Sequence, residues 1–166
     1  MSSNGMFIPE NFKIPSHLRT DQFRLEVLKE SLTAIDYEAV MSSRSRLRSI
    51  FFENDSWPKD DMSIQFNLDE LVVHEQEFNA REAFAYAVFT QDKDRYIGCV
   101  YINPAKADGY DCEVYLWVRD TETYLDADLF NEVEKWLKAE WPFTHRAYPG
   151  RTISWSDWVD NKSSLI

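Results

Sequence analysis

Glycine is scarce in this sequence, with four among 166 residues, and Gly98 is the only one within a run whose composition indicates a strand. A Walker loop and a dinucleotide-binding fingerprint both need several glycines at fixed spacing, because their backbones approach phosphates closely. Neither motif is present. The three histidines, His17, His74 and His145, lie far apart in the sequence. Their spacing indicates neither a zinc site nor a Ser-His-Asp set, so we expect no metal.

Cysteine is also rare. Cys99 and Cys112 are too few for a disulfide framework, and although they could face each other across a hairpin, we expect reduced, buried thiols. No apolar run approaches the roughly 20 residues that a membrane-spanning helix needs. The first 20 residues lack a basic start followed by an apolar core, so we expect no secretory signal and a cytoplasmic protein.

Positive charge is in the minority. The chain has 18 basic and 29 acidic residues and a formal net charge of −11. Such a surface repels phosphate backbones and anionic lipid, so we expect neither a nucleic acid nor a membrane as a partner. Hydrophobic residues at 44% and aromatic residues at 15% exclude a disordered chain, and 166 residues suit one domain.

The most informative stretch runs from Ala83 to Arg119. It holds three apolar, aromatic-rich runs, 84–89, 96–102 and 112–118, divided by polar segments. Short runs of β-branched and aromatic residues between turns predict an antiparallel meander of three strands. In the last run, alternation places one set of side chains on each face of the sheet. One set is Asp111, Glu113, Tyr115 and Trp117, and the other is Cys112, Val114, Leu116 and Val118.

The segments around this meander predict one strand before it and helices on both sides of it in the sequence. Residues 1–20 predict an extended arm that packs through Phe7, Ile8 and Phe12. We expect a single domain over 21–158 and a tail over 159–166. The expected elements are a strand at 23–28, a helix capped by Asp36 and ending near Phe51, a helix over about 68–83 capped by Asn67, a helix over about 125–140 stopped by Pro142, and a short strand within 143–155.

This order, together with two strand phrases, resembles the GNAT superfamily, the Gcn5-related N-acetyltransferases. Residues 96–104 (YIGCVYINP) are similar to the third strand of the family, and residues 113–118 (EVYLWV) to the fourth. The resemblance covers about 23–141. It implies an α+β fold, in which a mixed or antiparallel sheet with the three-strand meander at its centre is covered by helices. It also implies transfer of an acetyl group from acetyl-CoA to the amine of a small molecule or peptide.

The sequence departs from the family where the coenzyme would bind. The family has an R/Q-x-x-G-x-G/A motif after the fourth strand, and residues 123–128 (TYLDAD) stand in its place. A helix N-terminus attracts anions, and Asp126 and Asp128 would oppose a pyrophosphate there. Tyr124 adds bulk where small residues are expected. The chain after Trp141 is also short for the family's last helix and two strands.

Candidate site residues follow from the resemblance. Glu113 is the candidate catalytic base, with a structural carboxylate as the alternative interpretation. Backbone groups near Trp117, Val118 and Arg119 are the candidate cofactor contacts. Arg44, in a basic cluster, is a candidate for gripping a ligand's carboxylate or phosphate, with a solvated face as the alternative. The aromatic residues that could line a pocket are Tyr86, Tyr101 and Tyr115.

Two classes of function remain open. The first is a GNAT-related acyltransferase that uses acetyl-CoA. The second is a non-catalytic GNAT-like scaffold that has lost coenzyme A and binds a small molecule or a protein partner.

Overall fold

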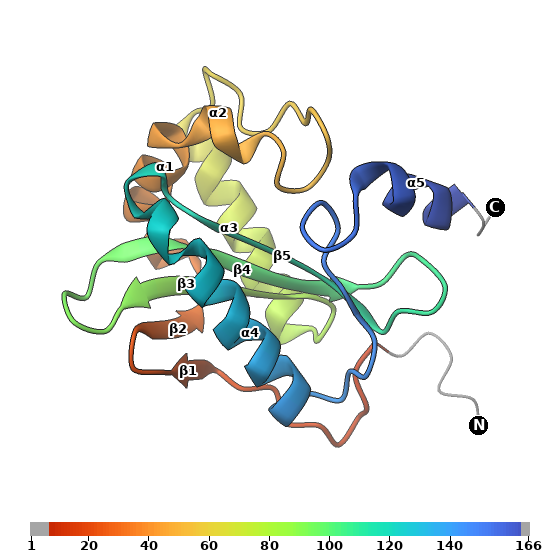
Figure 1. Ribbon diagram of the computed structural model, residues 1–166. Helices are drawn as coiled ribbons and strands as arrows, with labels where there is room; N and C mark the ends of the chain where they lie inside the picture. The colour runs from red at the N-terminus through yellow and green to blue at the C-terminus, as the bar shows by residue number, and fades with distance from the viewer. Residues whose placement is uncertain (1–6, 164–166) are drawn as a thin grey trace.

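A computed structural model describes residues 7–163, with side chains described over 7–159. Its centre is one sheet of six strands in the order β1-β2-β3-β4-β5-β6 (Figure 1). Neighbouring strands are antiparallel from β1 to β5, whereas β5 and β6 are parallel. The strands are β1 (His17–Arg19), β2 (Phe23–Val27), β3 (Phe84–Thr90), β4 (Tyr96–Pro104), β5 (Cys112–Val118) and β6 (Arg146–Ala147).

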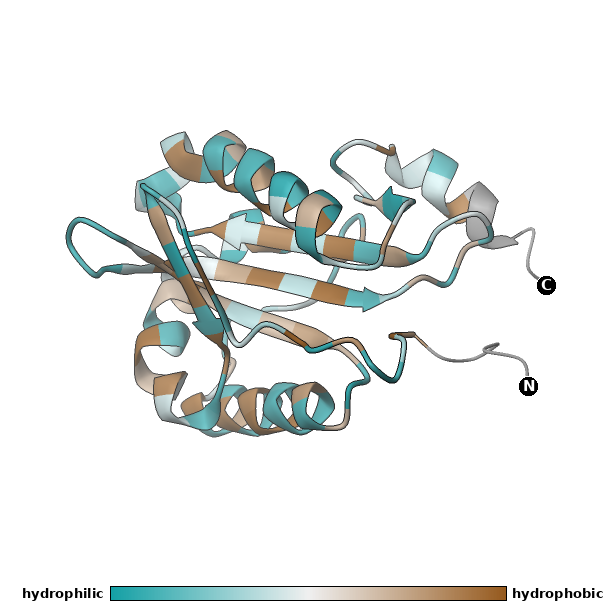
Figure 2. Ribbon diagram, turned by 90° about the horizontal axis from the view of Figure 1, so that it is seen from below, coloured by the Kyte–Doolittle hydropathy of each residue, from teal (hydrophilic) through white to brown (hydrophobic). Residues whose placement is uncertain are grey.

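Helices cover both faces of this sheet. Figure 2 shows α4 on one side of the strands and α3 on the other. The α-helices are α1 (Thr33–Ser42), α2 (Arg44–Leu47), α3 (Ile64–Asn79), α4 (Asp126–Glu140) and α5 (Trp155–Ser163). Two 3₁₀ helices, η1 (Glu30–Leu32) and η2 (Asp120–Leu125), precede α1 and α4. Within the part of the chain that the structure describes, no helix is long and apolar enough to cross a membrane.

The predicted meander is confirmed as β3, β4 and β5, and the predicted alternation in β5 holds. Val114, Leu116 and Val118 pack in the core that α4 covers, whereas Tyr115 and Trp117 pack in the core under α1 and α3. Every residue of β3 and β5 is buried. Strands buried on both faces favour apolar side chains along most of their length, which accounts for the aromatic-rich runs, and Thr90 and Glu113 are the polar exceptions.

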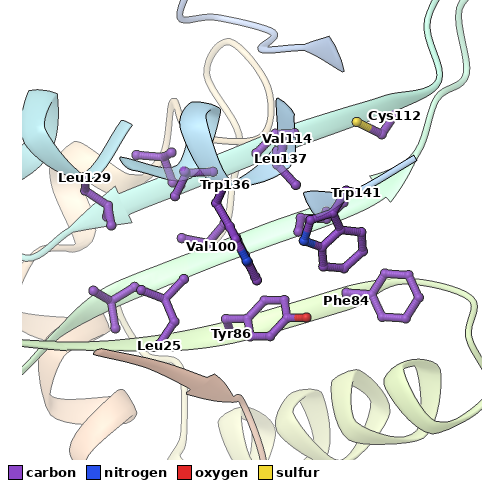
Figure 3. Close-up of a cluster of buried hydrophobic side chains, with 14 of the residues drawn as sticks. Leu25, Phe84, Tyr86, Val100, Cys112, Val114, Leu129, Trp136, Leu137 and Trp141 are labelled. Atoms are coloured by element: carbon purple, nitrogen blue, oxygen red, sulfur yellow. The ribbon is translucent and has the colours of Figure 1, made fainter. Parts of the chain in front are cut away.

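The core between α4 and the sheet is built from large aromatic rings. Trp136 is 3% exposed, and its ring meets Tyr86 and Trp141 edge to face at centroid distances of 5.2 and 5.4 Å (Figure 3). Leu129, Val133 and Leu137 complete the buried stripe of α4. The helix that we expected over 125–140 is therefore confirmed, and Trp141 ends it with extended backbone.

The helices on the other face differ from expectation at their starts. Asp36 does not cap a helix, because α1 begins at Thr33 and Asp36 is buried inside it. Asn67 is likewise inside α3, which starts at Ile64 with Ser63 as the N-cap residue and the Ser63 hydroxyl accepting from the Phe66 N–H. Asp36 and Asn67 hydrogen-bond to each other across the two helices, so tertiary contact replaces the local capping role.

Both ends of the chain carry elements that the sequence did not predict. The N-terminal arm packs as expected, with Phe7 stacked on Phe84 and Phe12 against Trp141, but it also forms β1. At the other end, α5 begins at Trp155 and runs into the segment expected as a tail. Residues 1–6 and 164–166 lie outside the described part of the chain.

Candidate functional site

The sheet opens between its last two strands. The parallel pairing of β5 with β6 consists of Cys112 opposite Arg146 and Glu113 opposite Ala147. Towards Val118 the two strands are no longer paired, and a cavity of about 270 Å³ lies beside the middle of β5. We call it the splay cavity. Its lining residues are Ser49, Ile50, Val114, Tyr115, Leu116, Pro149, Gly150 and Arg151.

A larger cavity, of about 590 Å³, lies on the face of the sheet that α1 and α3 cover. We call it the aromatic cavity. The α2–α3 loop and the first turns of α3 form much of its wall. Its aromatic lining residues are Phe51, Phe52, Trp57, Phe66 and Tyr101, and its ionisable ones are Asp36, Asp55, Lys59, Asp61, Glu70 and His74. Four carboxyl groups and one ammonium group make its electrostatic potential negative when the carboxyls are ionised.

Phe51, in the lining of the aromatic cavity, contacts one tyrosine from the lining of each cavity. Its ring lies 5.0 Å from the Tyr101 ring and 5.2 Å from the Tyr115 ring, measured between centroids. Tyr101 lines the aromatic cavity and Tyr115 lines the splay cavity. The linings of the two cavities are therefore connected through the ring contacts of Phe51.

Asp36 is the most buried ionisable group in the wall of the aromatic cavity, with 3% of the residue exposed. Its Oδ2 accepts from Asn67 Nδ2 at 2.9 Å, and its Oδ1 accepts from the Tyr96 hydroxyl and from Cys99 Sγ. Burial raises the pKa of Asp36, and these three hydrogen bonds oppose that rise. All three donors are neutral.

His74 also faces this cavity, from the middle of α3. Its ring lies 5.5 Å from that of Tyr101, and its side chain is 29% exposed. Burial lowers its pKa from 6.5 to about 4, because the imidazolium form loses hydration there. At pH 7 the ring is therefore neutral and adds no positive charge to the cavity.

Glu113, the candidate base, is 4% exposed and held at both carboxylate oxygens. Oε2 accepts from the Lys106 backbone N–H at 3.0 Å, and Oε1 accepts from the Tyr115 hydroxyl at 2.9 Å. Glu113 therefore ties the β4–β5 connection to β5. Its catalytic role remains a prediction.

The three candidate cofactor residues lie at the end of β5 that is not paired with β6. Trp117 is fully buried, and Val118 packs under α4. The Val118 carbonyl oxygen accepts from the Arg46 guanidinium. Arg119 donates to Glu38 Oε1 at 2.7 Å. All three residues are thus held by partners within the protein.

The four candidate pocket residues are not brought together. Tyr101 and Tyr115 line the two cavities described above, but Tyr86 lies on the opposite face, under α4. Its hydroxyl donates to a backbone carbonyl of the N-terminal arm at 2.7 Å. Arg44 is 43% exposed and pairs with Asp60 at 3.1 Å, so it lies outside both cavities and on a solvated face. Tyr86 and Arg44 therefore line neither of these two cavities, and their assignment to a ligand pocket stays a prediction.

The GNAT resemblance implies coenzyme A, whose diphosphate would bind at the start of α4. The first turn of α4 carries Asp126 and Asp128. Asp126 pairs with Arg151 at 2.7 Å, and Asp128 accepts from Gln22 at 3.0 Å. The cap position of α4 makes no side-chain hydrogen bond, yet these carboxylates already complement the positive end of the helix dipole.

Arginines near this end of α4 are engaged by carboxylates as well. The pairs are Arg46 with Asp120, Arg95 with Glu122, and Arg119 with Glu38. The six-residue η2 helix, which contains no glycine, joins β5 to α4. A diphosphate would have to displace carboxylates from their partners, so the residues at the start of α4 do not fit it.

Known structures share this fold. A ribosomal-protein-S5-alanine acetyltransferase from Vibrio fischeri matches with a TM-score of 0.57 and 13% identity over 74% of this chain and 67% of that chain. The ribosomal L7/L12 α-N-protein acetyltransferase RimL, in complex with coenzyme A, matches with a TM-score of 0.57 and 15% identity over 76% and 69%. The microcin C7 self-immunity acetyltransferase MccE, in complex with acetyl-CoA and AMP, matches with a TM-score of 0.60 and 13% identity over 75% and 66%.

The fold is therefore that of the GNAT acetyltransferases, as the two strand phrases predicted. In a further structure, an acetyltransferase from Vibrio cholerae, the match covers 64% of that chain, so this chain spans about two thirds of the length of the proteins it resembles. No family model and no curated protein sequence matches it.

The polar residues of the aromatic cavity are not among the candidate site residues predicted from the sequence. A signal for them exists in the pattern of α3, where Asn67, Leu71, His74 and Phe78 follow helical spacing. Two polar residues on the stripe that faces the sheet indicate a polar feature inside the fold.

Proposed function

We propose that this GNAT-fold protein binds a small organic amine in the aromatic cavity. The observation that supports this most directly is the lining of the cavity, in which aromatic rings are combined with an excess of carboxyl groups. Ring faces and carboxylates both attract cations, and the rings also bury apolar surface. The ligand that suits this lining carries an ammonium group on an apolar or aromatic body.

The size of the cavity supports a small molecule. A volume of about 590 Å³ lies within the range of about 300–1,000 Å³ typical of small-ligand sites. Phe66, which lines the cavity, is 49% exposed, so an apolar side chain lies at the border between cavity and solvent. Anionic ligands such as nucleotides are disfavoured, because carboxyl groups outnumber the single lysine.

Acyl transfer to the same amine is the second candidate function. The observation that favours it is the splay cavity, which lies beside β5 and whose lining residue Tyr115 contacts the Phe51 ring of the aromatic cavity. Glu113 is then the candidate base for the amine proton. The misfit at the start of α4 counts against coenzyme A as the donor, and for this reason we place binding first.

The binding function is tested by thermal melts against a panel of aromatic and aliphatic amines, with calorimetry on those that shift the melt. A ligand at about 100 times its Kd stabilises the folded state by about 2.7 kcal/mol, which a melt detects readily. Phe66→Ala should weaken binding of any such amine, because it removes part of the aromatic lining. Ile64→Ala is the matched control, since Ile64 is 50% exposed at the start of the same helix and lies outside the cavity lining.

Equal affinities of the two variants and the wild type would refute the assignment of this cavity. Acyl transfer is tested separately by free thiol release from acetyl-CoA in the presence of each amine that binds. In that assay Glu113→Gln should lower turnover by about 10²–10⁴ if Glu113 is the base.

A further inference from the structure

We propose that Asp36 is the counter-ion for the ammonium group of the cavity ligand and that it selects cationic ligands over neutral ones of the same shape. This inference rests on the proposed binding function and deepens it. It assigns the charge recognition to one buried side chain of α1 rather than to the exposed carboxylates at the cavity rim.

The first argument is the position of Asp36. It is 3% exposed, belongs to the lining of the aromatic cavity, and lies where α1, α3 and β4 meet. Asn67 of α3 and Tyr96 of β4 donate hydrogen bonds to it. Partners from two other elements fix the orientation of the carboxyl group, so it is held in place before a ligand arrives.

The second argument is the missing positive charge. Within residues 7–159, Asp36 takes part in no ion pair with a lysine, arginine or histidine within 4.0 Å. An ionised carboxylate without a cation is costly to bury, even when neutral donors solvate it. A cation supplied by a ligand would remove most of that cost.

The third argument is hydrogen-bonding capacity. An ionised carboxylate offers about four acceptor positions. Three donors surround Asp36, namely the Asn67 amide, the Tyr96 hydroxyl and the Cys99 thiol at 3.7 Å. One position thus remains for a donor from the cavity.

The groups around Asp36 add no competing cation near it. On α3, Glu70 carries a carboxyl group whose pKa is raised by burial, and His74 is neutral at pH 7. On β4, Tyr96, Cys99 and Tyr101 keep their protons, because burial raises the pKa of each. The remaining charged lining residues belong to the α2–α3 loop and are Asp55, Lys59 and Asp61, all near the solvent-exposed side.

A purely structural role for Asp36, bridging α1 to α3 and β4, makes a different prediction from ours. It predicts loss of stability on substitution but no change in which ligands bind. The readout therefore has to be ligand discrimination and not melting temperature alone.

Tryptamine and tryptophol form a suitable probe pair, because they share the indole and differ in an ammonium against a hydroxyl group. Calorimetry at pH 7 should give the wild type a Kd for tryptamine at least about tenfold lower than that for tryptophol. Asp36→Asn, which keeps the size and the Asn67 and Tyr96 neighbours, should raise the tryptamine Kd by about thirtyfold and leave that of tryptophol within about threefold. Asp69→Asn is the matched control, because Asp69 is an exposed carboxylate of α3 that lies outside the cavity lining, and it should keep the discrimination of the wild type.

Three outcomes overturn the inference. The first is equal binding of both probes to the wild type, and the second is a folded Asp36→Asn variant that retains the preference for tryptamine. In either case the aromatic cavity remains the proposed binding site, but Asp36 is not the counter-ion. If neither probe binds the wild type at millimolar concentration, the inference falls, and the amine panel decides the proposed function independently. Should Asp36→Asn fail to fold, a crystal structure of the wild type with tryptamine decides, because the ammonium must lie within hydrogen-bonding distance of Asp36.

Discussion

The buried imidazole of His74 should make the protein less stable in mild acid. Its pKa is about 4 in the folded protein against 6.5 for the ordinary group. Between these two values the unfolded chain binds more protons at His74 than the folded protein does. The contribution of His74 to the free energy of unfolding is therefore highest above pH 6.5. It decreases as the pH falls and reaches its minimum near and below pH 4.

The magnitude follows from the same two values. Each unit of difference is worth about 1.4 kcal/mol, so the full difference corresponds to about 3.4 kcal/mol. The side chain is 29% exposed, however, and solvent screening reduces the effect. We therefore expect His74 to account for about 2–3 kcal/mol of the stability lost between pH 7 and pH 4.

The assay is urea unfolding at a series of pH values from 7 to 4 for the wild type and for His74→Gln. Glutamine cannot be protonated, so the variant should lose about 2–3 kcal/mol less than the wild type over this range. The two proteins share the other titrating groups, whose contributions cancel in the difference. His17→Gln, at an exposed position of β1, is the control for the replacement of a histidine by glutamine as such. Parallel curves for wild type and His74→Gln would refute the burial argument.

Three further predictions concern the core, the meander and the start of α4. Trp136→Ala removes a ring packed against Tyr86 and Trp141 and should cost about 3–5 kcal/mol in denaturant melts, and a loss below about 1 kcal/mol would contradict the packing of α4 on the sheet. Gly98→Ala should cost about 2–3 kcal/mol, because a Cβ there would lie 1.9 Å from the Trp117 carbonyl oxygen, and similar melts for Gly98→Ala and wild type would contradict that close approach. Millimolar acetyl-CoA should leave the wild-type melting curve unchanged, because Asp126 and Asp128 occupy the start of α4, and a clear shift would restore coenzyme A binding.

The aromatic runs of the meander were enough to predict three of the strands, β3, β4 and β5. Strands such as β3 and β5 are buried on both faces, so their apolar character is continuous and their polar boundaries are sharp. The pattern of α4 was also clear, because one face of this helix is buried. The buried residues on that face are Leu129, Val133, Trp136 and Leu137. In these elements local pattern and tertiary environment agree, and the GNAT resemblance followed from them.

Helix starts and the shortest elements were decided by tertiary contact. Asp36 and Asn67 are good capping residues in isolation, and nothing local distinguishes that role from the buried hydrogen bond they form across α1 and α3. β1 is three residues long, too short to leave a periodic signal, and it forms because β2 offers its edge. The two-residue β6 lies within 143–155, where a short strand was expected, but its parallel pairing with β5 was set by tertiary contact.

The sequence by itself determined the meander, the amphipathic α4 and the misfit of the coenzyme loop, because each depends on residues close together in the chain. Only the tertiary structure decided the candidate site. The aromatic cavity is lined by Asp36 of α1, Trp57 of a loop, His74 of α3 and Tyr101 of β4. Tyr86 lies on the other face of the sheet. Asp36 and Tyr101 are 65 positions apart in the sequence, so a local pattern such as the polar stripe of α3 could indicate only one wall of this cavity.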